Sequence, residues 1–226
     1  MAALRLAGLA ACWFAGAALA TPPNEIKVFT DELAAYREHT LETHVNKGST
    51  GPLQVMPEYS YGIARDWEFS LQLPFAFTSD SANGEGYRVE LQYVAPHDGQ
   101  RGLYWGINME LARNDRVDEP RSTTAEIIPI LGYRSGRWHL VANPGFEHTL
   151  SGERDTAATP SAKVAYQVAG KNFVGFEAYA DAGDSRTLYV AWDGRLGKSD
   201  INVGFGRGYA SAADRWVLKA ICEIAF

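Results

Sequence analysis

Hydrophobic and polar residues alternate with a period of two along most of the chain. Residues 66–77 read DWEFSLQLPFAF, so Trp67, Phe69 and Leu71 share one face while Glu68 and Ser70 share the other. Successive side chains of a β-strand point to opposite faces, so this segment predicts a strand with one apolar face. The same pattern recurs in twelve segments: 39–47, 53–64, 66–77, 86–95, 101–112, 123–134, 136–149, 160–170, 172–181, 186–195, 199–208 and 214–226.

Segment length and the connections between segments favour a barrel that crosses a membrane. Most segments have about 9–12 residues, which is what a tilted strand needs to span a bilayer, and an even number suits closure. Tight links near residues 65, 135–136 and 170–171 contrast with longer polar links at 78–85, 113–122 and 150–159. We therefore predict an all-β fold, a transmembrane antiparallel up-and-down barrel of about 12 strands. A soluble barrel or sandwich is the alternative.

Aromatic residues on the apolar face provide a test of this topology, because membrane barrels carry aromatic girdles at both interfaces. At the ends expected on the periplasmic side, the alternation places Tyr61, Trp67, Tyr93, Trp105, Tyr133, Trp138, Tyr166, Trp192 and Phe226. At the outer ends it places Phe75, Phe77, Tyr87, Phe146, Phe205 and Trp216. The strand centres between these two groups are mainly aliphatic, as two membrane girdles require.

The N-terminus has the pattern of a targeting segment. Residues 1–20 contain one basic residue, Arg5, then an apolar run that ends in Ala18-Leu19-Ala20, a small-x-small cleavage pattern. We therefore predict a signal peptide at 1–20 and an outer-membrane β-barrel at 21–226. Residues 21–37 precede the first strand, either as a periplasmic extension or as a plug inside the barrel.

Composition and charge exclude several classes of protein. The chain has 226 residues, 46% hydrophobic, with two Cys and a formal net charge of -6. The apolar content is too high for a disordered chain, and two Cys do not make a disulfide scaffold. An acidic chain lacks the general attraction for phosphates that nucleic-acid binding needs, so no nucleic-acid partner is expected.

Four short stretches resemble one family of bacterial outer-membrane proteins. They are EIKVFTDE at 25–32, LETHVN at 41–46, PEYSYGI at 57–63 and WEFSL at 67–71. They are similar to the outer-membrane transporters of the phenol-degradation MetA-pathway type. The resemblance implies an outer-membrane location and a role in uptake. It carries no catalytic motif, and the phenol in the family name does not identify a ligand.

If the apolar face meets lipid, the polar face lines the lumen. The lumen-lining residues predicted in this way are Glu58, Glu68, Arg88, Glu90, Glu110, Glu126, Arg134, His139, Glu147, Lys163, Glu177, Asp193, Lys219 and Glu223. Acids outnumber bases in this set, so an open pore would favour cations or neutral solutes. A closed lumen knitted together by salt bridges is the alternative, and 12 strands are compatible with both.

Catalytic chemistry has little support in the sequence. An outer-membrane lipid hydrolase would need a nucleophilic Ser and a His on the lipid face near one rim, and His148 with Ser151 or Ser161 is the nearest match. The five His show no paired metal-ligand spacing. We therefore expect no enzyme, no catalytic, cofactor-binding or metal residues, and no cofactor.

The combined expectation is a passive channel in the bacterial outer membrane for small neutral, cationic or hydrophobic solutes, with a narrow acidic lumen. A closed structural or adhesive barrel without transport is the main alternative, and a lipid hydrolase is a weaker one. The expected partners are outer-membrane lipids and the barrel-assembly machinery. The machinery would recognise the final strand, which ends on the aromatic Phe226.

Overall fold

The structure, a computed structural model, describes residues 26–117, 119–152, 155–180, 186–209 and 214–226. The predicted signal peptide at 1–20 lies outside the described residues. Within the described ranges no helix is long and apolar enough to cross a membrane.

The described part of the chain forms one antiparallel sheet that closes on itself. The first strand pairs with both the second and the last, so the sheet has no free edge along its main path. The strands are β1 (His39–Gly48), β2 (Leu53–Ala64), β3 (Trp67–Gln72), β4 (Phe75–Phe77), β5 (Ala82–Gly84), β6 (Gly86–Val94), β7 (Gly102–Asn114), β8 (Ser122–Ser135), β9 (Trp138–Asn143), β10 (Phe146–Ser151), β11 (Thr156–Ala158), β12 (Ser161–Ala169), β13 (Asn172–Ala180), β14 (Arg186–Leu196), β15 (Ser199–Gly208) and β16 (Val217–Ala225).

These strands make a barrel of 12 strands. β3 and β4 follow one another along β2, with a break at Pro74, which has no N–H to donate. β9 and β10 follow one another along β8, with a break at Pro144 and Gly145. The short strands β5 and β11 extend the hairpins at β4 and β10. The predicted all-β antiparallel barrel of about 12 strands is confirmed.

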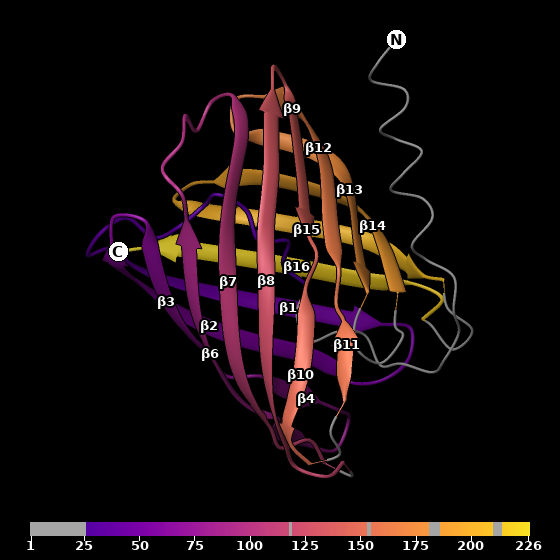
Figure 1. Cartoon of the computed structure of the whole chain (residues 1–226). Helices are drawn as coiled ribbons and strands as arrows, with labels where there is room; N and C mark the ends of the chain where they lie inside the picture. The colour runs from indigo at the N-terminus through magenta and orange to yellow at the C-terminus, as the bar shows by residue number, and fades with distance from the viewer. Residues whose placement is uncertain (1–25, 118, 153–154, 181–185, 210–213) are drawn as a thin grey trace.

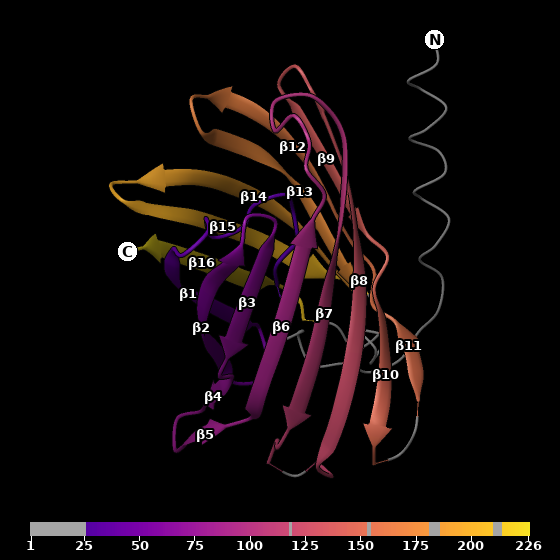
Figure 2. The same ribbon diagram turned by 60° about the vertical axis from the view of Figure 1, so that its left-hand side comes forward.

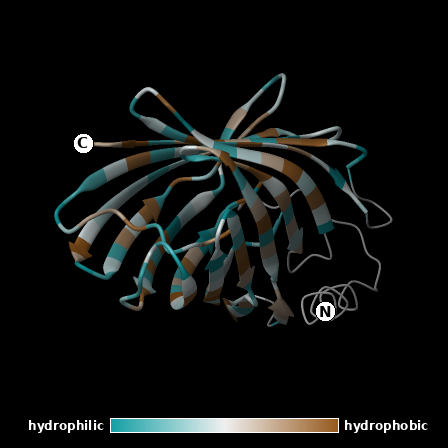
Figure 3. Ribbon diagram, turned by 90° about the horizontal axis from the view of Figure 1, so that it is seen from above, coloured by the Kyte–Doolittle hydropathy of each residue, from teal (hydrophilic) through white to brown (hydrophobic). Residues whose placement is uncertain are grey.

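Two walls of the barrel face each other across the lumen. In Figure 1 the strands β6, β7 and β8 run along the front, and β14, β15, β16 and β1 cross behind them at a large angle. Figure 2 shows the β10–β11 hairpin beside β8 at the end where the longer loops lie. Seen from above, hydrophobic and hydrophilic residues alternate along the strands (Figure 3).

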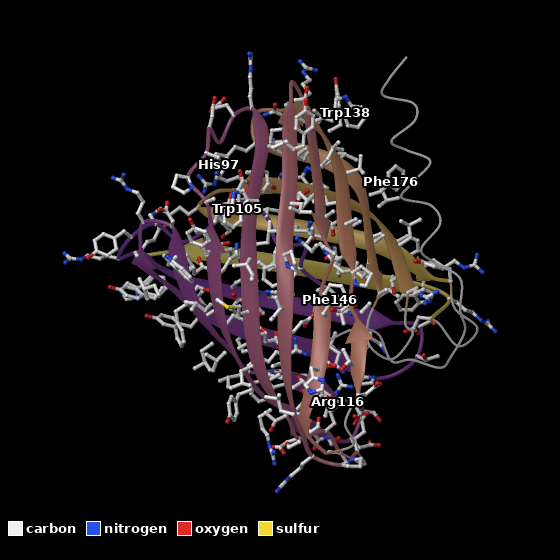
Figure 4. The ribbon with its side chains drawn as sticks, viewed as in Figure 1. His97, Trp105, Arg116, Trp138, Phe146 and Phe176 are labelled. Carbon is white, nitrogen blue, oxygen red and sulfur yellow. The ribbon has the colours of Figure 1, made fainter. Side chains whose placement is uncertain are left out.

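The outward face of the barrel is apolar and exposed. Leu103, Phe226, Phe205 and Phe176 are 80%, 72%, 60% and 57% exposed. Monomeric soluble proteins rarely expose apolar patches this extensive, so the surface matches hydrocarbon better than water. In Figure 4 Trp105, Trp138 and Phe176 project outward from the wall.

Aromatic side chains form contacts around the end where the chain terminates. Ring centroids lie 4.8 Å apart for Trp67–Tyr93, 5.8 Å for Tyr93–Trp105 and 4.9 Å for Trp138–Tyr166. The other residues expected there, Tyr61, Tyr133, Trp192 and Phe226, are half-buried or exposed. Each of the nine alternates along its strand with inward residues, which places it on the outward face. Their role as a membrane girdle stays a prediction.

Residues 26–38, which we call the N-terminal segment, lie inside the barrel. In Figure 1 its indigo trace passes between the front and back walls. The carbonyl of Ile26 accepts hydrogen bonds from Tyr179 and Lys219 at 2.7 and 3.0 Å, and the carbonyl of Phe29 accepts one from Asn143 at 3.0 Å. Of the two positions left open by the sequence, the structure places these residues in the lumen.

Gly62 on β2 makes room for this segment. The backbones pair, with Arg37 donating to the Gly62 carbonyl at 2.8 Å and Gly62 donating to that of Glu38 at 3.1 Å. A Cβ at position 62 would lie 2.0 Å from the carbonyl oxygen of Ala35. Only glycine allows the two backbones to approach this closely.

The Gly62→Ala variant should therefore loosen the N-terminal segment without changing the barrel. Overpacking costs about 1–3 kcal/mol, so trypsin should cleave after Lys27 and Arg37 about tenfold faster or more in the folded protein. Gly84→Ala is the matched control, because a Cβ there meets its nearest neighbour at 3.8 Å. Equal cleavage rates in the two variants would contradict the close packing at Gly62.

Candidate functional site: the barrel lumen

The predicted lumen residues lie on the inward face of the wall. Seven are buried: Glu58, Glu68, Glu90, Glu110, His139, Glu177 and Lys219. The other seven are half-buried: Arg88, Glu126, Arg134, Glu147, Lys163, Asp193 and Glu223. The structure divides most of them among three groups on different parts of the wall.

The first group is an acidic row on the front wall. Strand register places Glu90 opposite Glu110, Glu110 opposite Glu126, and Glu126 opposite Glu147. Like charges directly opposite each other destabilise a sheet, so this row does not serve stability. Arg88 lies 3.5 Å from Glu110, and the side chains of Gln72 and Asn108 donate to Glu90. The row therefore presents more acid than base to the lumen.

The second group is a mixed network on the back wall. The Lys163 ammonium lies 2.7 Å from Asp193 and 3.2 Å from Glu177, on neighbouring strands. Lys219 forms an ion pair with Glu177 and donates to the Tyr179 hydroxyl at 2.9 Å. Burial of these charges requires such pairing, because an unpaired ion in the interior is costly. Here acids and bases balance.

The third group binds the N-terminal segment through Asp31. The guanidinium of Arg134 on β8 donates twice to this carboxylate, at 2.6 and 3.2 Å. His97 lies 3.0 Å from the same carboxylate, and His139 lies 4.0 Å away while sharing a 2.7 Å hydrogen bond with the Tyr104 hydroxyl. Arg134 thus anchors the segment through the fork geometry that guanidinium and carboxylate groups favour.

A fourth group joins the predicted lumen residue Glu58 to two residues that the sequence reasoning missed. Glu42 and His44 on β1 and Glu58 on β2 bring ligand atoms within 4.8 Å of one another, and all three side chains are buried. Lys27 of the N-terminal segment lies 3.0 Å from Glu42 and 3.7 Å from Glu58. The alternation at 39–47 already put Glu42 and His44 on one face, so the signal for their inward position was present.

Several side chains inside the lumen are tightly packed. Tyr189, Ile26, Ile130, His44, Gln72, Glu58 and Glu177 are each less than 2% exposed. They come from the N-terminal segment and from both walls, so the segment fills space between the walls. Glu32 on the same segment is exposed, so water still reaches part of the interior.

The lipid-hydrolase residues have other partners. His148 shares a 2.7 Å hydrogen bond with Thr156 across the β10–β11 hairpin, and Ser161 donates to Asn143 at 3.2 Å. Ser151 pairs with Thr123 in the sheet. A contact of His148 with Ser151 or Ser161, which a lipid hydrolase would need, is not among the contacts of the described residues.

Comparison with solved structures reveals similar barrels. The chain is similar to the COG4313 outer membrane channel from Pseudomonas putida F1, with a TM-score of 0.68 and 10% identity over 89% of this chain and 100% of that one. It is also similar to the NanC porin, with a TM-score of 0.54 and 11% identity over 83% and 98%. The chain has the fold of an outer-membrane β-barrel. At these identities the likeness establishes the fold alone.

A third similar structure is the outer membrane phospholipase A from Escherichia coli, with a TM-score of 0.48 and 10% identity over 85% of this chain and 97% of that one. A likeness at that level supports no inference about activity. No protein-family model and no curated protein matches the sequence. The resemblance to the MetA-pathway type is therefore not confirmed, whereas the broader expectation of an outer-membrane β-barrel fold is confirmed.

The Asp31→Asn variant should weaken the anchoring of the N-terminal segment. The Arg134 side chain, 17% exposed, would lose its ionic partner, so we expect a fall of about 1–3 kcal/mol in the free energy of unfolding. Urea unfolding of the protein refolded into lipid vesicles measures this change.

Asp200→Asn is the matched control, because it removes an ion pair to Arg195 in which both side chains are nearly half exposed. Exposed pairs contribute little. Equal losses of stability in Asp31→Asn and Asp200→Asn would exclude the proposed anchor.

Proposed function

We propose that this protein is an outer-membrane channel for small cationic or neutral solutes. The acidic row of Glu90, Glu110, Glu126 and Glu147 is the observation that carries the proposal. The row weakens the sheet, so stability does not explain it. A role in a water-filled pore does, because acidic rings line pores that favour cations. A low-dielectric wall also concentrates such a field inside the pore.

In this proposal the position of the N-terminal segment determines whether the channel is open or closed. Packed side chains leave little room for a solute while the segment lies in the lumen, so passage requires that it shift. Hydrogen bonds and ion pairs, such as those of Asp31 and Lys27, hold it to several parts of the wall, and Val28 and Phe29 are buried against the wall. Water can replace the polar contacts singly, and the apolar contacts are few, so the proposal is that the segment moves without unfolding the barrel.

The proposal places the protein in the bacterial outer membrane and gives it no catalytic activity. The apolar outward face and its aromatic side chains fit a lipid bilayer, and the similar structures are of outer-membrane proteins. β16 carries an outward apolar face to Phe226, which we propose as the signal for the assembly machinery. Solute movement down a gradient needs no cofactor.

A closed structural barrel is the second candidate. The packing of seven inward side chains to less than 2% exposure favours it. In that case the acidic row would contact bound water, and the outer loops would be the part of the molecule that meets partners.

Planar-bilayer recording of the refolded protein tests the channel. We expect single-channel currents with cation preference, seen in the reversal potential under a salt gradient. Glu110→Gln combined with Glu126→Gln should lower the cation-to-anion permeability ratio about fivefold or more, because a charge about 4 Å from an ion in water contributes roughly 1 kcal/mol.

Glu119→Gln removes a charge from an exposed loop and serves as the control, which should keep the original ratio. A correctly folded barrel that carries no current would favour the structural candidate. Currents with unchanged selectivity in the double variant would exclude the acidic row as the selective element.

A further inference from the structure

A buried cluster of metal-ligating groups lies on the wall between β1 and β2. Glu42 and Glu58 are direct cross-strand neighbours, and His44 follows Glu42 by two residues on the same inward face. The Nε2 atom of His44 lies 3.1 Å from the Oε2 atom of Glu58 and is hydrogen-bonded to the Oε1 atom of Glu42. Two carboxylates and an imidazole therefore converge on one point.

The donor set selects for a particular class of cation. Zinc takes histidine nitrogen and carboxylate oxygen at about 2.0–2.2 Å, which puts neighbouring ligand atoms about 3.3 Å apart in a tetrahedral site. The His44–Glu58 distance of 3.1 Å is close to this spacing. Magnesium and calcium favour oxygen ligands alone, so the imidazole disfavours them.

A second observation shows that this point attracts a cation. The ammonium of Lys27 lies 3.0 Å from Glu42 and 3.7 Å from Glu58, although it belongs to a segment that approaches from inside the lumen. The side chains of Glu42 and Glu58 are 6% and 1% exposed, whereas that of Lys27 is 26% exposed. Part of the Lys27 side chain is therefore open to the lumen, and this is the side from which a dissolved ion would approach.

We propose that Glu42, His44 and Glu58 form a binding site for a divalent transition-metal ion, and that Lys27 competes with the metal for it. When the metal binds, the ammonium withdraws, and the proton on His44 Nε2 is released to water so that the nitrogen lone pair can coordinate the ion. The two carboxylate charges are then balanced by the metal alone. A metal at this site removes one contact that holds the N-terminal segment in the lumen.

The site is independent of transport. It requires only the wall of the folded barrel, and its occupancy can be measured whether or not the barrel conducts. Failure of the channel proposal therefore leaves this one standing, and failure of metal binding leaves the channel proposal standing.

Titration calorimetry of the folded full chain with zinc chloride tests the site. We expect one saturable site per chain. Lys27→Gln should bind zinc at least tenfold more tightly than the unmodified protein, because the competing ammonium is gone. Lys47→Gln, which removes an exposed ammonium bound to the Gly51 carbonyl, should leave the affinity unchanged.

Adding His44→Gln or Glu58→Gln to Lys27→Gln should reduce the affinity at least a hundredfold. His148→Gln on the outer hairpin is the control for loss of a histidine, and magnesium chloride is the control for the metal. Folding of each variant is checked by circular dichroism and by its heat-modifiable migration in gels.

The visible absorption spectrum of bound Co²⁺ tests the site without substitution of Glu42, His44 or Glu58. In the Lys27→Gln protein, Co²⁺ should give the visible bands of a nitrogen- and oxygen-ligated ion, and one equivalent of zinc should remove them. Absence of saturable zinc binding in Lys27→Gln would overturn the proposal. Binding that survives His44→Gln and Glu58→Gln unchanged would do the same.

Discussion

Burial of charge is the constraint on which the interior of this protein depends. A carboxylate enclosed by a barrel wall must find a cation, a hydrogen-bond donor or water, because an unpaired ion in a low-dielectric interior is very costly. On the back wall Lys163 and Lys219 meet this need for Glu177 and Asp193. Between β1 and β2 the wall supplies His44, with Ser60 and Gln72 donating hydrogen bonds to Glu58, and the N-terminal segment supplies Lys27. The segment is thus part of the electrostatic balance of the lumen as well as part of its packing.

The same constraint connects the structure to its proposed activity. Asp31 of the segment neutralises Arg134, and Lys27 neutralises the carboxylates near β1, so two residues four positions apart on the segment bind charges of opposite sign. When the segment shifts, both sets of wall charges become available to water and to solutes. The acidic row on the front wall has four carboxylates with Arg88 beside Glu110, and in the proposed open state it would dominate the field of the lumen. A metal bound by Glu42, His44 and Glu58 would change this balance at one point.

Much of the fold follows from local patterning. The period-two alternation identified each barrel strand, because a strand that separates lipid from a polar lumen must alternate over its whole length. It also separated the residues predicted for the lumen from those predicted for the girdle, and both roles stay predictions. The breaks at Pro74 and Pro144 divide two predicted strands, as a residue without a backbone donor does at a kink.

The candidate site could be predicted only in part, for two physical reasons. Which side chains become neighbours depends on register between strands, and alternation alone does not set register, so the contiguity of Glu90, Glu110, Glu126 and Glu147 was not visible. The N-terminal segment has no periodicity, since it packs through individual contacts rather than as a strand. Its ion pairs through Lys27 and Asp31 join residues far apart in the chain and left no local signal.

Hydrogen exchange of the folded barrel in lipid nanodiscs, followed by mass spectrometry, tests the central claim that residues 26–38 lie in the lumen. The account predicts that the amides of Ala34 and Arg37, which donate to Glu68 and to the Gly62 carbonyl, exchange far more slowly than in the same peptide free in solution. Exchange across residues 26–38 at the rate of the free peptide, with the strands still protected, would contradict it.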